Sequence, residues 1–190
     1  MTEPQREALE VASSETKRTI RLLQDLLSLA RADSGYLYCS LESFVLNDLV
    51  VEVVEMVEQF SNRTIAIEGI SPVKVRLDRN FLKQGLINLI DNAVKYSASA
   101  TPITLKLEQI AENVLIQVCL RGYGIPLQQQ TRIFERFYRV DEARSPEGSG
   151  LSLAIVKTLV EGMGGSVTVR SKLGEGVYLQ SPYLLIYKLL

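Results

Sequence analysis

The sequence predicts an α+β protein, a two-layer sandwich with helices on one face of a mixed sheet, preceded by one amphipathic helix. The first observation is helical spacing of apolar residues in four ranges: 6–32, 46–60, 78–94 and 151–163. The second is a set of strand-like stretches at 64–70, 73–77, 103–108, 114–120, 166–171 and 178–187. Helices and strands that each have one apolar face favour a layered architecture.

The first helical segment, residues 6–32, has an apolar stripe along one side. Its members lie three or four residues apart: Leu9, Ala12, Thr16, Ile20, Leu23, Leu27 and Ala30. Such a stripe is typical of a helix that packs against a partner helix. Asp33, Ser34 and Gly35 then end the segment with turn residues. We therefore expect two parts, residues 1–35 and residues 36–190, of which the second forms the sandwich.

Local signals predict further elements in the second part. The helix 46–60 has valines on one side: Val50, Val53, Val54 and Val57. Two strands follow around a turn at residues 71–72, and Asp78 is suited to cap the next helix because its carboxylate can accept hydrogen bonds from the first N–H groups. The polar stretch 126–150 includes Phe134 and Phe137, and we expect it to be a mobile lid rather than core.

The composition excludes several classes of site and partner. A formal net charge of -1 provides no global field for nucleic acid or an anionic membrane. The chain has no histidine, which excludes Ser/His/Asp and Cys/His catalytic systems and histidine-based metal sites. Cys39 and Cys119 lack the spacing of a zinc site or disulfide framework, so we expect reduced thiols. No apolar run approaches the roughly 18 residues of a membrane span, and the first nine residues are too polar for a signal peptide. We expect a cytoplasmic chain without direct membrane contact, on its own or on the cytoplasmic side of a membrane-anchored parent.

One helix face combines groups that suit a nucleotide and its metal ion. Asn88, Asn92, Lys95 and Tyr96 fall at i, i+4, i+7 and i+8, so they share one face. Amide oxygens can ligate Mg²⁺, and a lysine can neutralise phosphate charge. The alternative interpretation, a solvated helix face, stays open for these residues taken alone.

Two glycine pairs are candidate phosphate-binding turns. Gly122 and Gly124 follow a strand, whereas Gly148 and Gly150 precede a helix whose N-terminal amides can approach phosphates. Either pair alone is more typical of an ordinary turn.

Four motifs in this order resemble those of the sensor histidine kinase catalytic domain. They are its asparagine box at 88–96, first glycine box at 121–126, phenylalanine box at 132–141 and second glycine box at 148–156. Gly174-Glu175-Gly176 is similar to the third glycine box, and residues 22–35 resemble the end of the family's second dimerisation helix. The resemblance covers essentially the whole chain. It implies that residues 1–35 are the second helix of a dimerisation hairpin and that residues 36–190 are a Bergerat-type ATP-binding catalytic domain.

The resemblance also implies roles for individual residues. The implied nucleotide-binding positions are Asn88, Asn92, Lys95, Tyr96, Gly122, Gly124, Ile125, Arg139, Gly148, Ser149, Gly150 and Leu151. Asn92 is the implied Mg²⁺ ligand with Asn88 in support, Lys95 and Tyr96 contact phosphates and ribose, and Arg139 reaches the terminal phosphate of ATP. Related hydrolases have a glutamate where Asn88 stands. Because an asparagine cannot take a proton, Asn88 fits transfer to a histidine better than hydrolysis.

The chain departs from the family pattern at several positions. The phospho-accepting histidine is missing, so the chain is either a fragment or a natural truncation. Leu120 replaces the aspartate that accepts a hydrogen bond from the adenine amino group, a loss of about 1–3 kcal/mol, or roughly 5- to 150-fold in affinity. Ser152 replaces a glycine, a change that we expect to be mild. Val177 lacks the hydroxyl usual after the third glycine pair, and Pro182 interrupts the last strand.

Three hypotheses follow. The first is an ATP-binding catalytic part of a histidine kinase, active on a histidine supplied by another chain. The second is a pseudokinase that regulates a partner kinase by association, and the third is a remnant without function. Expected partners are a histidine-bearing dimerisation helix or partner kinase chain and a response regulator. We also expect a homodimer or hetero-association through residues 6–32. The signal sensed and the response regulator addressed cannot be inferred from these residues.

Overall fold

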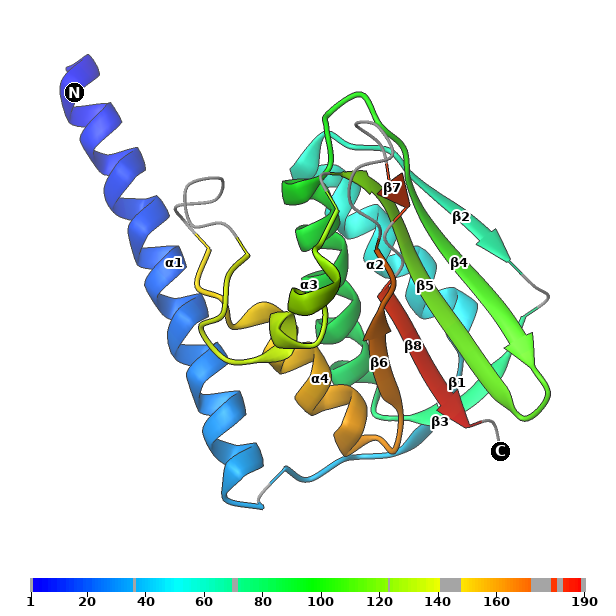
Figure 1. Cartoon of the computed structure of the whole chain (residues 1–190). Helices are drawn as coiled ribbons and strands as arrows, with labels where there is room; N and C mark the ends of the chain where they lie inside the picture. The colour runs from blue at the N-terminus through cyan, green and yellow to red at the C-terminus, as the bar shows by residue number, and fades with distance from the viewer. Residues whose placement is uncertain are drawn as a thin grey trace. The chain divides into compact units, whose positions relative to one another are not determined.

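The computed structural model divides the chain into two compact units, residues 1–37 and 38–190 (Figure 1). The described residues are 2–35, 37–69, 72–122, 124–140, 148–171, 179–180 and 183–188.

The first unit consists of one long helix, α1 (Glu3–Asp33). Its first turn is capped by Gln5, whose Oε1 accepts a hydrogen bond from the Thr2 N–H at 2.9 Å. It ends at Ser34 and Gly35, and Gly35 adopts a φ of 73°. The predicted helix is confirmed. Four large members of its apolar stripe are exposed: Leu9, Ile20, Leu23 and Leu27.

The second unit combines three helices with two sheets. Its elements in chain order are β1 (Glu42–Val45), α2 (Leu46–Ser61), β2 (Ile65–Gly69), β3 (Lys74–Leu77), α3 (Arg79–Tyr96), β4 (Ile103–Ile110), β5 (Asn113–Gly122), the 3-10 turns η1 (Leu127–Gln129) and η2 (Arg132–Phe134), α4 (Ser152–Gly162), β6 (Ser166–Val169), β7 (Leu179–Gln180) and β8 (Tyr183–Lys188). Figure 1 shows α2, α3 and α4 on one face of the main sheet.

The main sheet is mixed, with the strand order β2-β4-β5-β8-β6. β2 runs parallel to β4, and the other neighbours are antiparallel, with β7 pairing to the end of β5. This arrangement confirms the predicted two-layer α+β sandwich. Among the described residues, the strands β2 and β3 do not pair with each other. β3 instead pairs with β1 in a separate small sheet, and β1 is a four-residue strand that the sequence pattern did not predict.

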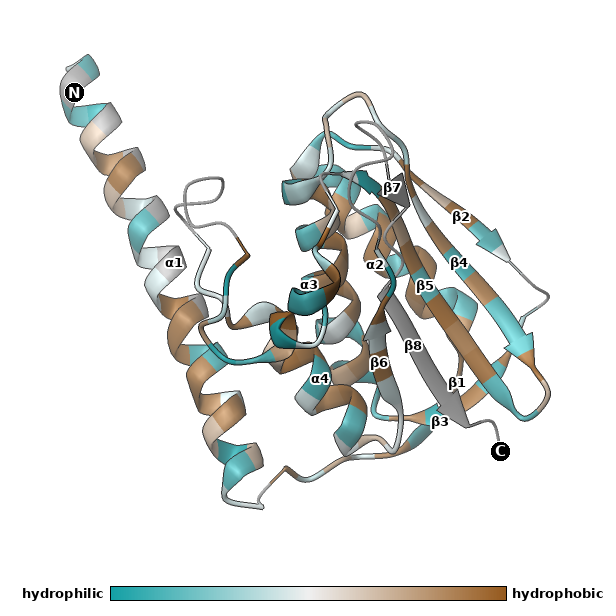
Figure 2. Ribbon diagram, viewed as in Figure 1, coloured by the Kyte–Doolittle hydropathy of each residue, from teal (hydrophilic) through white to brown (hydrophobic). Residues whose placement is uncertain are grey.

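The core lies between the main sheet and α3. β5 is apolar along most of its length, whereas apolar and polar residues alternate on β4 (Figure 2). Fully buried side chains of α3, among them Leu82, Leu86, Leu89 and Ile90, belong to the same core cluster as Ile103 and Leu105 of β4 and Ile116 of β5. Burial of each such side chain stabilises the fold by about 1.5–3 kcal/mol. The helix predicted from the apolar spacing over residues 78–94 is therefore confirmed, with its apolar residues in the core.

Asp78 fixes the beginning of α3. Its Oδ1 accepts hydrogen bonds from the N–H groups of Asn80 and Phe81, both at 3.0 Å. Its Oδ2 accepts a hydrogen bond from the N–H of Ser40 at 2.8 Å. The predicted N-cap is confirmed, and the same carboxylate also holds the chain that leads into β1.

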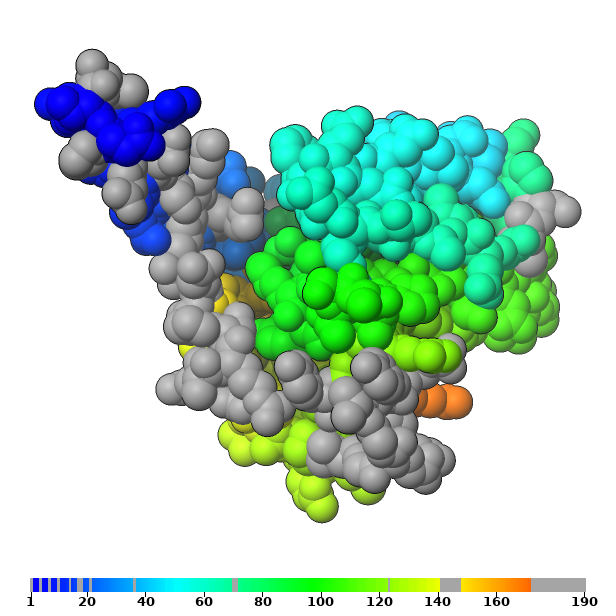
Figure 3. All heavy atoms as spheres, turned by 90° about the horizontal axis from the view of Figure 1, so that it is seen from above, coloured from blue at the N-terminus to red at the C-terminus, as the bar shows by residue number. Residues whose placement is uncertain are grey.

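Polar contacts hold α2 beside α3. Glu52 accepts a hydrogen bond from Lys83 at 2.5 Å and another from Arg79, and these two bonds, in that order, hold the pKa of its carboxyl below the usual value. At the opposite end of α3, Arg63 Nη2 donates to Ser97 Oγ at 3.0 Å and to the Thr101 carbonyl at 2.7 Å. Figure 3 shows the cyan atoms of α2 beside the green atoms of the segment that includes α3.

The predicted lid, residues 126–150, is only partly separate from the core. Ile133 in η2 is 5% exposed and joins the core cluster, and Phe134 packs against it. The prediction that this stretch lies outside the core is therefore wrong for η2, because tertiary packing buries one side of a short 3-10 turn. Phe137 is 65% exposed, as expected for a lid. Residues 141–147 lie outside the described residues.

The last helix and the strand after it agree with the sequence pattern. The predicted helix 151–163 and strand 166–171 are present as α4 and β6. The third glycine pair, Val177 and Pro182 lie outside the described residues.

Both Cys39 and Cys119 are free, and burial raises the pKa of each thiol. Among the described residues, none of the helices has the length and apolar character of a membrane span.

Candidate functional site

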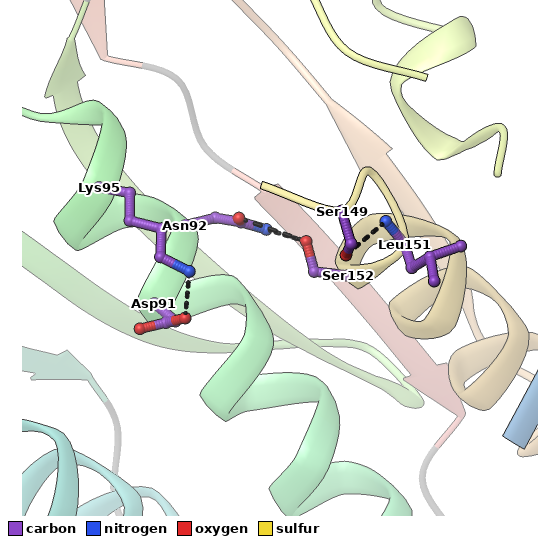
Figure 4. Close-up of polar contacts among 6 residues, drawn as sticks. All are labelled: Asp91, Asn92, Lys95, Ser149, Leu151 and Ser152. Carbon is purple, nitrogen blue, oxygen red and sulfur yellow. Dashed lines mark hydrogen bonds and ion pairs between the residues drawn. The ribbon is translucent and has the colours of Figure 1, made fainter. Parts of the chain in front are cut away.

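The polar face predicted on α3 is present, but its members differ in exposure. Asn92 is buried, with 5% of its surface exposed, and Asn88 is half-buried. Lys95 and Tyr96 are exposed in the last turn. Asn92 points away from α3 toward the beginning of α4, whereas Lys95 bends toward Asp91 (Figure 4). The predicted face therefore divides into a buried amide part and an exposed cationic part.

Lys95 is paired with Asp91 on the surface of the helix. Their Nζ and Oδ2 atoms are 2.7 Å apart, and both side chains are close to half exposed. An exposed pair at i and i+4 contributes only about 0.3–0.5 kcal/mol. Lys95 can therefore exchange Asp91 for a more highly charged anion at little cost.

Asn92 and Ser152 join α3 to α4 through a direct side-chain contact. Asn92 Nδ2 lies 3.2 Å from Ser152 Oγ, and Ser152 Oγ lies 3.3 Å from Asn92 Oδ1 (Figure 4). The two residues are 60 positions apart in the sequence. The sequence showed Ser152 only as a mild departure from a glycine pattern. The signal that was available, a hydroxyl at the first position of α4, did not identify its partner.

Asn88 contains a buried polar atom without a partner. Within the described residues, its Nδ2 is buried and makes no hydrogen bond. The assignment of amide nitrogen and oxygen follows from the hydrogen-bond network, so the same position can present an oxygen. A buried amide that is left unpaired is unfavourable, which indicates a group that accepts a ligand or water.

The beginning of α4 provides backbone donors. The first helical hydrogen bond joins the Ile155 N–H to the Leu151 carbonyl at 2.9 Å. The N–H groups of residues 152–154 precede it, and within the described residues they have no side-chain cap. Uncapped N–H groups at a helix N-terminus attract anions. Ser149 Oγ accepts a hydrogen bond from the Leu151 N–H at 3.3 Å, and the Leu151 side chain itself is buried.

Gly150 permits close contact between the predicted lid and α4. Its φ is 70°, and a Cβ there would lie 2.7 Å from the Phe137 carbonyl carbon. The Phe137 N–H donates to the Gly150 carbonyl at 3.0 Å. A side chain at position 150 would be both strained and obstructed, which accounts for the glycine. The second glycine box and the phenylalanine box therefore pack directly on each other.

A different close contact accounts for the glycine at position 122. A Cβ at this position would lie 2.4 Å from the Tyr96 carbonyl oxygen, because the end of β5 bridges to Ser97 just after α3. Gly122 thus lets the first glycine box approach the asparagine box. Gly124 has a φ of 77°. The Ile125 N–H donates to Ser171 Oγ at 2.8 Å, which fixes the chain beyond the glycines.

Leu120 lies on β5, two residues before Gly122, where β5 bridges to Ser97. It is 5% exposed and belongs to the core cluster. Its side chain offers no hydrogen-bond acceptor to a ligand.

Arg139 and Gly148 lie on either side of residues 141–147, which are outside the described residues. Both are half-buried.

The residues of this region fit a magnesium-bound polyphosphate. Mg²⁺ prefers oxygen ligands, and it binds few protein groups when substrate phosphates supply the rest. Asn92 and the unpaired amide of Asn88 provide such groups one turn apart, beside the uncapped N–H groups of α4. No group of three or more His, Cys, Asp or Glu residues that could hold a metal occurs within the described ranges.

Comparisons with known proteins agree with this arrangement. Residues 77–183 match the family of histidine kinase-, DNA gyrase B- and HSP90-like ATPases. The sensor protein IrlS of Burkholderia pseudomallei is 34% identical over 172 residues, which cover 88% of this chain and 37% of IrlS. The sensor histidine kinase WalK of Bacillus subtilis is 34% identical over 175 residues, which cover 88% of this chain and 29% of WalK. The chain thus spans roughly a third of the length of these relatives.

Solved structures show the same fold. Full-length ShkA, crystallised in complex with AMPPNP, has a TM-score of 0.81 and 27% identity, and the match covers 100% of this chain and 40% of ShkA. The catalytic domain of the histidine kinase ThkA has a TM-score of 0.65 and 25% identity over 78% of this chain and 95% of that domain. The matched family, the relatives and the fold together show that this chain belongs to the histidine kinase-, DNA gyrase B- and HSP90-like ATPase family, among the catalytic domains of sensor histidine kinases.

Proposed function

We propose that residues 36–190 bind ATP with Mg²⁺ and transfer its terminal phosphoryl group to a histidine on another helix. The observation that carries this proposal is the juxtaposition of two polar surfaces. The buried amide of Asn92 on α3 meets the uncapped N-terminus of α4 through Ser152. One surface suits a cation and the other suits phosphates.

The proposed roles follow from the chemistry of each group. Asn92 is the Mg²⁺ ligand, and Asn88 supports it with the amide that has no partner among the described residues. Lys95 leaves Asp91 to neutralise a phosphate, Tyr96 contacts phosphate or ribose, and Arg139 in the lid reaches the terminal phosphate. The bound cation neutralises charge on the phosphates as the phosphoryl group is transferred.

The glycine segments complete the proposed nucleotide site. Gly148, Ser149, Gly150 and Leu151 present backbone to the phosphates, and Gly150 lets that backbone pack on Phe137. Gly122, Gly124 and Ile125 form the wall next to the end of α3.

The type of reaction is inferred from a group that is missing on α3. Asn88 stands where a water-activating carboxylate would be needed for hydrolysis, and an amide cannot accept a proton. We therefore propose phosphoryl transfer rather than ATP hydrolysis. With no histidine in its 190 residues, the chain requires an acceptor from a partner.

The first unit is proposed to supply the contact with that partner. α1 exposes the large apolar members of its stripe, Leu9, Ile20, Leu23 and Leu27. We propose that residues 1–35 are the second helix of a dimerisation hairpin and pair with a histidine-bearing helix of a kinase chain. A response regulator then receives the phosphoryl group. ThkA, a structural neighbour with 20% identity, was crystallised with its response regulator TrrA. A cytoplasmic site of action is part of the same proposal.

A second candidate function is a pseudokinase that binds its partner but holds nucleotide weakly. Leu120 favours it, because a buried leucine faces the core where an acceptor for the adenine amino group is expected. The retained amides, lysine and glycines favour the enzyme. Affinity for nucleotide decides between the two.

Replacing Asn92 tests the proposed metal site. Asn92→Ala is expected to weaken binding of AMPPNP in the presence of Mg²⁺ by on the order of 10- to 100-fold, because a cation ligand is lost. Binding in EDTA should change little. Isothermal titration measures both. Asn80→Ala is the matched control, since Asn80 is an exposed asparagine at the other end of the same helix. Equal Mg²⁺-dependent affinity in Asn92→Ala and in the unmodified chain would contradict the assignment.

A further inference from the structure

Asn92 makes its side-chain hydrogen bonds with one residue in the described part of the chain, Ser152. The hydroxyl oxygen lies 3.2 Å from Asn92 Nδ2 and 3.3 Å from Asn92 Oδ1, so it faces the end of the amide (Figure 4). One hydroxyl can accept from the nitrogen alone, or accept from it and also donate to the oxygen. The first arrangement leaves the amide oxygen free for a ligand, and the second uses one of its lone pairs.

The balance of hydrogen bonds favours the first arrangement. Without acceptance by Ser152 Oγ, the Asn92 Nδ2 donor would be buried without a partner among the described residues, which is unfavourable. If the hydroxyl only accepts from Nδ2 and does not also donate to Oδ1, Oδ1 keeps both lone pairs for a cation. A cation on Oδ1 then satisfies both ends of the amide, and it polarises the amide so that Nδ2–H becomes a stronger donor.

We propose that Ser152 is a positioning residue for the metal site: its hydroxyl accepts a hydrogen bond from Asn92 Nδ2 and so directs Asn92 Oδ1 toward Mg²⁺. The inference rests on the proposed function. Partners of this kind fix the orientation of metal ligands. A glycine, which stands at this position in the family pattern, has no group that can do so. Because Ser152 is also the first residue of α4, its hydroxyl couples the metal ligand to the helix end that faces the phosphates.

Substitutions at position 152 test this role through the Mg²⁺ dependence of binding. Ser152→Ala and Ser152→Gly are expected to weaken Mg²⁺–AMPPNP binding by about 3- to 10-fold, the effect of losing one neutral hydrogen bond. Affinity in EDTA should not change. Ser152→Thr keeps the hydroxyl and should retain the affinity of the unmodified chain. Ser43→Ala, at an exposed position of β1, is the control for loss of a serine hydroxyl elsewhere.

A second readout needs no nucleotide. The side-chain NH₂ signal of Asn92 in a ¹H–¹⁵N spectrum is expected to shift in Ser152→Ala and to return in Ser152→Thr. Ala is a good helix former at the start of α4, so the fold should persist, and circular dichroism checks this.

The outcomes separate this inference from the proposed function. A Ser152→Ala chain that binds Mg²⁺–AMPPNP as tightly as the unmodified chain, or more tightly, would overturn the positioning role alone. A loss of equal size with and without Mg²⁺ would also overturn it, since that is an effect of packing. An Asn92 signal unchanged in Ser152→Ala would show that the contact is absent. Failure of the unmodified chain to bind AMPPNP at all would contradict the proposed function.

Discussion

The purified chain is expected to remain unlabelled after incubation with γ-labelled ATP and Mg²⁺. The proposed transfer requires an imidazole acceptor, and the 190 residues contain no histidine. The expected effect is complete, because the acceptor of the proposed transfer is an imidazole and this chain has none. Gel electrophoresis at neutral and acidic pH measures the label and its stability.

The same reaction with an added acceptor distinguishes an enzyme from a binding module. A dimerisation hairpin from a sensor histidine kinase, with its histidine intact, should gain acid-labile label when the chain is present. The hairpin with its histidine replaced by alanine is the control. Acid-labile label on the chain itself would refute the argument from composition, and an unlabelled hairpin would favour the pseudokinase.

Leu120→Asp is expected to tighten ATP binding by about tenfold or more. The substitution supplies an acceptor for the adenine amino group, and a charge-assisted hydrogen bond contributes about 1.5–3 kcal/mol. GTP should gain little, because guanine presents a carbonyl where adenine presents its amino group, and that carbonyl would face the new carboxylate. Nucleotide binding by the unmodified chain should depend on Mg²⁺ and should discriminate poorly between ATP and GTP, since the phosphates provide most of the affinity. Isothermal titration of both chains with both nucleotides measures this.

Leu120→Asp should also destabilise the folded protein. Leu120 is 5% exposed within the core cluster, so a carboxylate there should lower the melting temperature of the free protein. Leu120→Ala is the matched control, because it opens the same space without an acceptor and should leave the preference for ATP unchanged. Tight, adenine-selective binding by the unmodified chain would show that Leu120 does not weaken adenine binding. Absence of binding by a folded Leu120→Asp chain would indicate a site lost beyond this residue.

Features encoded locally could be predicted from the sequence. The period of apolar residues in α3 and the carboxylate of Asp78 are both contained within a few turns of chain, and the structure confirms them. The mixed sheet followed from the order of strand-like stretches. The sequence also predicts a candidate turn at Gly148 and Gly150, and the positive φ of Gly150 agrees with a turn.

Features that depend on distant partners could not be predicted in this way. The short strand β1 is stabilised by pairing with β3 more than by its own pattern, and β2 pairs with β4 rather than with its neighbour in sequence. Ile133 was assigned to a lid because its surroundings are polar, yet tertiary packing buries it. The sequence indicates only a mild change at Ser152, because serine can adopt helical angles, and it does not show the partner Asn92 on another helix.

The most direct measurement is a map of the nucleotide on the unmodified chain by ¹H–¹⁵N spectroscopy. Addition of AMPPNP with Mg²⁺ is predicted to shift backbone and side-chain amide signals of residues 88–96 on α3 and 148–154 at the beginning of α4, and to shift them far less in EDTA. The Asn92 side-chain signal should be among those that move most. Shifts confined to other parts of the chain, or no shifts at saturating AMPPNP, would contradict the proposed site.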